Sequence, residues 1–253
     1  MEKAVQIRGL SIGTGTPKIC IPIVGKNLSE ISGQARRIAE SKNADLVEWR
    51  ADCFPDTRNP MKLLEALGVL RKELGGLPLL FTIRTAAEGG QADYSEQDYL
   101  AANRVAMTSG LIDLVDVQYA AARVWLSEFI MEAHRNQTAV VVSSHNFQAT
   151  PGREQMVSLL TEMAQAGADL PKLAVMPNTP ADVLNLLSAT REAYDKTGRP
   201  LITMSMSKLG SISRVCGALT GSAVTFGTEG ESSAPGQIPA GQLKTLLERF
   251  SLS

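Results

Sequence analysis

Short runs of branched apolar residues alternate along the whole chain with longer stretches that have an amphipathic, helix-like pattern. The runs are rich in Val, Ile and Leu, which is typical of strands buried on both faces of a parallel sheet. Pro78 and Pro200 directly precede two of the runs, where a missing backbone donor costs little. We therefore predict strands at 19–24, 45–50, 79–84, 112–118, 138–144, 173–176, 201–206 and 223–227.

The stretches between these runs carry signals for the start and end of helices. Thr150-Pro151 and Thr179-Pro180 each combine an N-capping threonine with a proline suited to the first helical position. Gly198 lies where a helix C-cap is expected. Strands and helices are therefore predicted to alternate regularly.

About eight β/α units without a linker predict an α/β fold, a (β/α)8 TIM barrel that forms one catalytic domain over residues 1–253. The segment 5–13 precedes the first unit, and we expect it to form a short N-terminal β-hairpin that closes the barrel bottom. A doubly wound sheet is the alternative, but it requires a glycine-rich turn after its first strand. Gly13 and Gly15 precede that strand instead, which favours the barrel.

Charge and composition exclude several classes of function. Lys and Arg number 25 against 26 Asp and Glu, and this balance argues against nucleic acid as a partner. No apolar segment approaches the roughly 20 residues that span a bilayer, and the amino terminus lacks the pattern of a signal peptide. With two histidines and three scattered cysteines, we expect reduced thiols, no metal site and a cytoplasmic location without membrane contact.

Charged side chains recur near the carboxyl ends of the predicted strands, where a TIM barrel places its chemistry. Glu48 and Arg50 share one face of the second strand, because side chains alternate with a period of two. Arg84 ends the third strand, Glu88 lies in the loop after it, and His145 follows the fifth. Taken singly, Glu48 and Arg50 could form a structural ion pair, and the histidine could cap a strand. Together the residues predict an active site at the barrel mouth.

Lys172 is the most informative of the charged residues, because it directly precedes the apolar run 173–176. It must either extend to solvent or lie desolvated in the barrel. Desolvation and a nearby arginine both lower the pKa of a lysine, which leaves a free amine able to attack a carbonyl. With His145 as general base and no metal, these residues favour a Schiff-base lyase whose substrate they leave unspecified.

These motifs resemble one family closely, the type I 3-dehydroquinate dehydratases of the shikimate pathway, which use a lysine imine. The resemblance runs in the order of the family from residue 17 to residue 238. It is carried by PKIC at 17–20, EWRAD at 48–52, LLFTIRTAAEGG at 79–90, SHNF at 144–147, GADLPKLAVMP at 167–177, ITMSMSK at 202–208, ISR at 212–214, GSAVTFG at 221–227 and SAPGQI at 233–238.

The resemblance implies an enzyme that dehydrates 3-dehydroquinate to 3-dehydroshikimate without a cofactor, in aromatic amino-acid biosynthesis. Lys172 would form the imine with the C3 ketone. His145 would remove the C2 proton and then protonate the departing C1 hydroxyl, with Glu88 fixing its orientation. Arg214 would bind the substrate carboxylate through both oxygens.

The resemblance also assigns further substrate contacts. Ser233 and Gln237 lie in the loop that closes over the substrate in the family. Met204 and Met206 would line the apolar side of the pocket. Contacts to the ring hydroxyls, and the electrostatics near the imine, would come from Glu48, Arg50 and Arg84. Family members are expected to be homodimers.

The chain departs from the family pattern at a few positions. Gln118 stands where the family usually has a glutamate, and the lost negative charge could shift the pKa of the catalytic groups. Asn146 replaces the usual aspartate, a change that the family tolerates. Leu209 and the stretch 228–231 are also unusual, so loop closure could differ in detail.

Two other functions compete with the dehydratase. A class I aldolase also uses a barrel lysine, but it needs a phosphate site near the last two strands. The segment 234–237 does not resemble such a site, and Arg214 suits a carboxylate. A non-catalytic barrel that binds a shikimate-type acid would be marked by loss of Lys172, His145 or Glu88, and all three are present.

Overall fold

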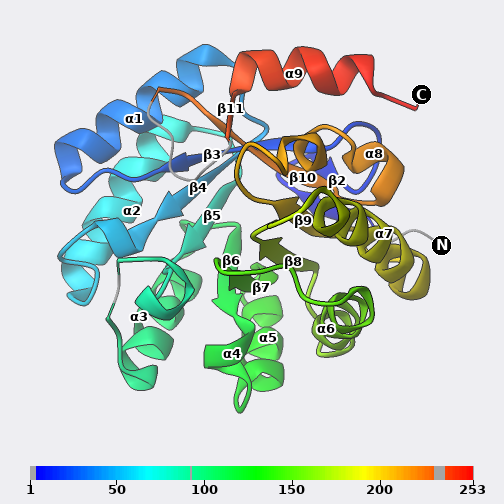
Figure 1. Cartoon of the computed structure of the whole chain (residues 1–253). Helices are drawn as coiled ribbons and strands as arrows, with labels where there is room; N and C mark the ends of the chain where they lie inside the picture. The colour runs from blue at the N-terminus through cyan, green and yellow to red at the C-terminus, as the bar shows by residue number, and fades with distance from the viewer. Residues whose placement is uncertain (1–3, 92, 231–236, 253) are drawn as a thin grey trace.

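The computed structural model describes residues 4–91, 93–230 and 237–252, and it places a ring of strands inside a ring of helices (Figure 1). The strands of the main sheet are β3 (Lys18–Ile23), β4 (Leu46–Arg50), β5 (Leu79–Thr82), β6 (Leu114–Gln118), β7 (Ala139–Asn146), β8 (Leu170–Val175), β9 (Ile202–Ser205), β10 (Val224–Thr228) and β11 (Ile238–Pro239). The helices are α1 (Leu28–Ser41), α2 (Pro60–Leu74), α3 (Glu96–Thr108), α4 (Tyr119–Ala122), α5 (Leu126–Arg135), α6 (Arg153–Gln165), α7 (Pro180–Thr197), α8 (Gly217–Thr220) and α9 (Ala240–Arg249), with short 3-10 turns η1 (Ala51–Cys53), η2 (Ala86–Glu88) and η3 (Ser211–Arg214). In these described ranges, no helix has an apolar stretch long enough to cross a membrane.

The main sheet is parallel throughout and runs in the order β11-β10-β3-β4-β5-β6-β7-β8-β9. Strands β9 and β10 meet through a parallel bridge between Leu201, next to β9, and Ser222, next to β10. The amide of Ala223 donates to the carbonyl of Leu201 across this junction at 2.7 Å. The sheet therefore closes, which confirms the predicted barrel and excludes the doubly wound alternative.

The predicted N-terminal hairpin is present as β1 (Val5–Ile7) and β2 (Leu10–Ile12), which pair antiparallel. Ile7 and Ile12 are buried against inward-facing residues from the amino halves of the barrel strands. This bottom layer includes Cys20, Leu46, Leu80, Leu114, Val141, Leu170, Ile202 and Val224. The hairpin therefore closes the barrel bottom as expected, and apolar contacts fill the interior below the site.

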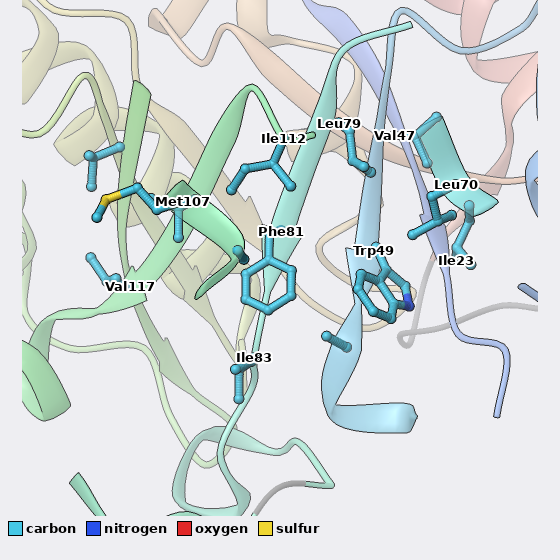
Figure 2. Packing of buried hydrophobic residues seen from close by; sticks show 14 of the residues in the cluster. Ile23, Val47, Trp49, Leu70, Leu79, Phe81, Ile83, Met107, Ile112 and Val117 are labelled. Carbon is cyan, nitrogen blue, oxygen red and sulfur yellow. The ribbon is translucent and has the colours of Figure 1, made fainter. Parts of the chain in front are cut away.

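The outer faces of the strands pack on the helices through the larger hydrophobic core. Figure 2 shows Trp49 of β4 and Phe81 of β5 next to each other, with Leu70 of α2 in the same cluster. The Trp49 and Phe81 rings lie edge to face, with centroids 5.7 Å apart. Because strand side chains alternate, burying Trp49 outward turns its neighbour Glu48 into the barrel.

The predicted start of α7 is confirmed and that of α6 is wrong. Thr179 caps α7 by accepting a hydrogen bond from the amide of Asp182 at 3.3 Å. Helix α6 instead begins at Arg153, with Gly152 at the N-cap. The hydroxyl of Thr150 donates to the carbonyl of Met176 at 3.0 Å, so it joins two loops and does not cap the helix.

Several predicted strand boundaries also change, and three of the changes matter for the site. Strand β5 ends at Thr82, so Arg84 lies in the loop after the strand and not at its end. Strand β8 begins at Leu170, three residues earlier than predicted, and pairs Lys172 with Ser143 of β7. Strand β7 continues to Asn146 and so contains His145. Lys172 therefore lies inside a strand, which excludes the alternative of a lysine just outside it that extends to solvent.

We expect Phe81→Ala to lower the free energy of unfolding by about 3–5 kcal/mol, because the aromatic side chain is fully buried and its loss leaves a cavity. Phe250→Ala is the matched control, since this phenylalanine is 52% exposed, and it should change stability little. Denaturant unfolding of both variants measures the difference. Equal losses in the two variants would contradict the assigned core.

Candidate active site

A cavity of about 210 Å³ opens at the carboxyl ends of the barrel strands. Its lining residues are Glu48, Arg50, Arg84, Glu88, Gly89, His145, Phe147, Lys172, Ala174, Met204, Met206, Arg214, Phe226 and Gln237. The structure thus brings the predicted site residues together at the barrel mouth, with one exception. Ser233 lies outside the described residues.

Lys172 extends from β8 into the barrel interior and is 3% exposed. Its Nζ donates to Asp116 Oδ2 at 3.1 Å and to Glu48 Oε1 at 3.3 Å. The same nitrogen lies 4.6 Å from the centroid of the Phe226 ring. From the sequence, desolvation and a nearby arginine were the expected influences on Lys172, and the structure adds two carboxylates that contact the amine directly.

Asp116 is the centre of the buried charge network and is itself 0% exposed. Arg84 Nη2 donates to Asp116 Oδ2 at 2.8 Å, and the hydroxyl of Ser143 donates to Oδ1 at 2.6 Å. Burial alone raises the pKa of Asp116, but the charges of Arg84 and Lys172 outweigh it and hold the pKa well below its usual range. Sequence analysis did not select Asp116 as a site residue. A signal was present, because Asp116 lies two residues before Gln118 and therefore faces the same side of the strand.

His145 and Glu88 form the hydrogen bond that the resemblance implied, with Nδ1 and Oε2 2.9 Å apart. Burial, together with the charges of Arg84 and Lys172, lowers the pKa of His145 well below its ordinary value. Burial raises the pKa of Glu88 to about 7, although Arg84 and a hydrogen bond from Gln118 oppose the shift. An ionised Glu88 accepts the Nδ1 proton, which leaves the Nε2 lone pair of a neutral imidazole available.

Phe147 is a part of the site that the sequence interpretation missed. Its ring stacks on the imidazole of His145, with centroids 6.2 Å apart and an angle of 15° between the planes. Gly89 packs against the same ring and has a φ of +79°. A Cβ at Gly89 would lie 2.5 Å from the Phe147 ring, so this position requires glycine for both backbone and space.

Arg50 is bound to Asp52 and not to Glu48. Its Nε and Nη2 each donate to the Asp52 carboxylate at 2.8 Å. Glu48 accepts instead from the hydroxyl of Thr82 at 3.0 Å, in addition to its contact with Lys172. The alternative of a structural Glu48–Arg50 ion pair is therefore wrong.

Arg214 lies at the end of η3, buried near Met204 and Met206 in the wall of the cavity. Its Nη1 donates to the carbonyl of Phe226 at 3.4 Å. Burial lowers the pKa of Arg214 to about 10, so the guanidinium remains positively charged near neutral pH. A planar cation in an apolar wall is well suited to bind a carboxylate.

Gln118 lies behind the cavity, where it holds the loop that carries Glu88. Its Oε1 accepts from the amide of Thr85 at 2.8 Å, and its Nε2 donates to the Thr85 hydroxyl at 3.1 Å. Because Gln118 also opposes the rise in the pKa of Glu88, this departure from the family pattern acts on the site through Glu88.

The other departures have local structural consequences. Asn146 Oδ1 accepts from the amides of Gln148 and Ala149, at 2.9 Å each, as an aspartate could also do. Leu209 is partly exposed on the loop after β9. The unusual stretch 228–231 is described as far as Gly230, which has a φ of +101°.

The described residues hold no group of three or more His, Cys, Asp or Glu side chains arranged to bind a metal ion. The exposed ring of His134 lies on the surface, with its Nε2 2.8 Å from Asp169 Oδ2. Cys20, Cys53 and Cys216 all fall in the described ranges and are free thiols.

Comparison with known proteins identifies relatives over almost the whole chain. Residues 19–252 match the model of a family described as type I 3-dehydroquinase. A 3-dehydroquinate dehydratase of Bacillus licheniformis is 44% identical over 248 residues, which cover 98% of this chain and 97% of the relative.

Two solved structures are also similar to this chain over nearly its whole length. A type I 3-dehydroquinate dehydratase from Clostridium difficile, with covalent modified comenic acid, matches with a TM-score of 0.95, 42% identity and coverage of 98% of both chains. A 3-dehydroquinate dehydratase from Geobacillus kaustophilus matches with a TM-score of 0.94, 39% identity and coverage of 98% of this chain and 96% of that chain.

We expect Asp116→Ala to lower the free energy of unfolding by about 3–5 kcal/mol, because it leaves the buried charges of Arg84 and Lys172 without their shared partner. Asp195→Ala is the control: this aspartate also pairs with an arginine, Arg191, but on the surface. Thermal and denaturant unfolding should detect a large loss in the first variant and little change in the second. A small effect of Asp116→Ala would contradict its central role in the network.

Proposed function

Because the chain belongs to the type I 3-dehydroquinase family, we propose that it converts 3-dehydroquinate to 3-dehydroshikimate and water through an imine on Lys172. The family match and the names of the relatives identify a hydro-lyase of the shikimate pathway. They also exclude the class I aldolase and the non-catalytic binding protein. The observation that carries the proposed mechanism is the buried amine of Lys172, in one cavity with the neutral imidazole of His145.

The first step is attack of the Lys172 amine on the C3 ketone, followed by loss of water to give a protonated imine. The amine must first lose its extra proton, and the Glu48 carboxylate at 3.3 Å is an acceptor within reach. Asp116 has a depressed pKa and stays ionised, so it serves as the counter-charge of the cationic imine. Burial strengthens this interaction, because little water screens it.

The second step is removal of the C2 proton by His145, with the protonated imine accepting the electron pair to form an enamine. Burial keeps the His145 imidazole neutral, and the Glu88 carboxylate fixes Nδ1 as the protonated nitrogen. The enamine then expels the C1 hydroxyl, which leaves as water with the proton from His145. Hydrolysis of the imine that results releases 3-dehydroshikimate and restores the Lys172 amine.

We propose that substrate recognition divides between polar and apolar walls of the cavity. Arg214 would bind the carboxylate, and Glu48, Arg50 and Arg84 would contact the ring hydroxyls. Met204 and Met206 would cover the apolar side, and Gln237 would contact the substrate together with Ser233, which the resemblance alone assigns. The resemblance further supports one catalytic domain over residues 1–253, a homodimer, a cytoplasmic location and no cofactor, all of which stay proposals.

We expect Lys172→Ala to abolish turnover while leaving ligand binding largely intact. Addition of 3-dehydroquinate to the unchanged protein should raise the ultraviolet absorbance of the conjugated enone product, and metal chelation should not prevent the rise. Borohydride reduces an imine and so fixes the substrate on the lysine, which should increase the mass of the wild-type protein but not of Lys172→Ala. Lys62→Ala, which removes an exposed lysine, is the control and should show the same increase as the wild type. Normal turnover in Lys172→Ala would contradict the imine mechanism.

We expect kcat/KM to fall as the pH decreases through about 7, because protonated Glu88 no longer accepts the Nδ1 proton of His145. Well below that pH, the fall should approach about tenfold per pH unit. The pKa of His145 is lowered, so its own protonation begins at more acidic pH. Arg84 and Asp116 also act on Glu88, and both keep their charge across this range.

Gln118→Glu tests whether the fall of kcat/KM at acidic pH, the acidic limb of the pH–rate profile, is due to Glu88. It replaces a neutral side chain that lowers the pKa of Glu88 with a second carboxylate that raises it, so the midpoint of the pH–rate profile should move to higher pH by about one unit. Gln97→Glu adds the same charge on the exposed face of α3 and serves as the control. A profile that does not change in Gln118→Glu would show that Glu88 does not control the limb.

A further inference from the structure

The barrel closes differently between β9 and β10 than between its other strands. The strand pairs from β10 through β3 to β9 share regular parallel ladders. Across the closing junction, which we call the seam, the ladder is reduced to the bridge between Leu201 and Ser222. The remaining backbone groups on this edge of β9 therefore need other partners, because buried amides are rarely left unpaired.

Two serine hydroxyls supply those partners. The amide of Thr203 donates to Ser222 Oγ at 3.0 Å, and the amide of Ser205 donates to Ser213 Oγ at 2.9 Å. These two amides lie two residues apart on the same edge of β9, where the carbonyls of a neighbouring strand would accept in a regular ladder. Side chains thus replace backbone acceptors along the seam.

Ser213 does more than satisfy the strand edge. Its hydroxyl, in a side chain that is 4% exposed, donates to the carbonyl of Gly210 at 2.7 Å. A Cβ at Gly210 would lie 2.2 Å from the carbonyl oxygen of Ser205, so the turn packs directly on the end of β9. Through one hydroxyl, Ser213 therefore connects the end of the strand, the turn after it and the 3-10 turn η3.

The next residue along the chain is Arg214, whose guanidinium lines the cavity. We propose that Ser213 is a positioning residue for Arg214, and that its hydrogen bonds to β9 place the guanidinium where it meets the substrate carboxylate. This inference rests on the proposed role of Arg214 as the carboxylate site. Ser213 itself does not line the cavity, so it acts through its neighbour.

The chemistry of the carboxylate predicts which kinetic constant changes. The carboxylate keeps its charge while the C2 proton and the C1 hydroxyl depart, so Arg214 binds the ground state and the transition state about equally. Loss of such binding raises KM and leaves kcat nearly unchanged. A displaced guanidinium loses the bidentate geometry of its charge-assisted hydrogen bonds to the carboxylate, so binding weakens.

The test compares Ser213→Ala with Ser222→Ala, which removes the other seam hydroxyl, eight residues beyond Arg214. Affinity for quinate is measured by calorimetry, because quinate has the carboxylate and has a hydroxyl in place of the ketone, and so cannot form an imine. We expect Ser213→Ala to weaken quinate binding and to raise KM for 3-dehydroquinate, each about tenfold, with kcat within about threefold. Ser222→Ala should lower the melting temperature comparably but leave affinity and KM unchanged.

Repeating both substitutions in an Arg214→Ala background isolates the coupling. If Ser213 acts through Arg214, Ser213→Ala should have no further effect on quinate affinity there. Equal weakening in both backgrounds, no weakening in either, or the same weakening by Ser222→Ala would overturn the inference while leaving the proposed function intact. If Arg214→Ala alone does not weaken quinate binding, the carboxylate site is wrong and the inference with it.

If Ser213→Ala does not fold, Ser213→Cys provides the same test with a side chain of similar size and weaker hydrogen bonding. It should give a smaller increase in KM of the same kind. An unchanged KM and quinate affinity in folded Ser213→Cys, in which the hydrogen bonds are weakened, would count against a positioning role.

Discussion

Charge neutrality inside the barrel is the constraint on which the rest of the site depends. Lys172 and Arg84 bring two positive charges into the buried wall of the cavity, and Asp116 and Glu48 bring two negative ones. Each ion alone would cost several kcal/mol to bury, so the four are stable only together and only with their hydrogen bonds in place. Ser143 and Thr82 supply those hydrogen bonds from the neighbouring strands. The strand register is therefore an electrostatic requirement as well as a packing one.

The same network separates the ionisation of the groups around it. Positive neighbours keep Asp116 ionised, and burial together with the same neighbours keeps the imidazole of His145 neutral. Burial also makes Glu88 easier to protonate. A base, its orienting carboxylate and a permanent counter-charge thus arise from side chains of ordinary type in one cavity. Their different roles come from environment, because burial and nearby charge act on each group with a different balance.

The sequence carried enough information for the barrel and for most of the cavity. Apolar runs at regular intervals indicate parallel strands, and charged residues at their ends converge at the mouth of any such barrel. The partners of Lys172 could not be predicted in this way, since the contact with Asp116 depends on the register between β6, β7 and β8. Thr150 was misread as a helix cap because its bond to Met176 crosses between loops. Phe147 was missed because stacking on His145 has no local sequence pattern.

The hairpin beneath the barrel affects how substrate and product enter and leave the cavity. Ile7 and Ile12 complete an apolar layer under the charged residues. The barrel interior is therefore closed at the bottom, and the cavity opens at the carboxyl ends of the strands. A molecule that reaches Lys172 enters and departs by the same opening, and the next molecule must wait until the previous one has left. Bound product therefore competes directly with incoming substrate. The apolar layer at the barrel bottom, far from the reacting atoms, imposes this competition because it closes the other end of the barrel.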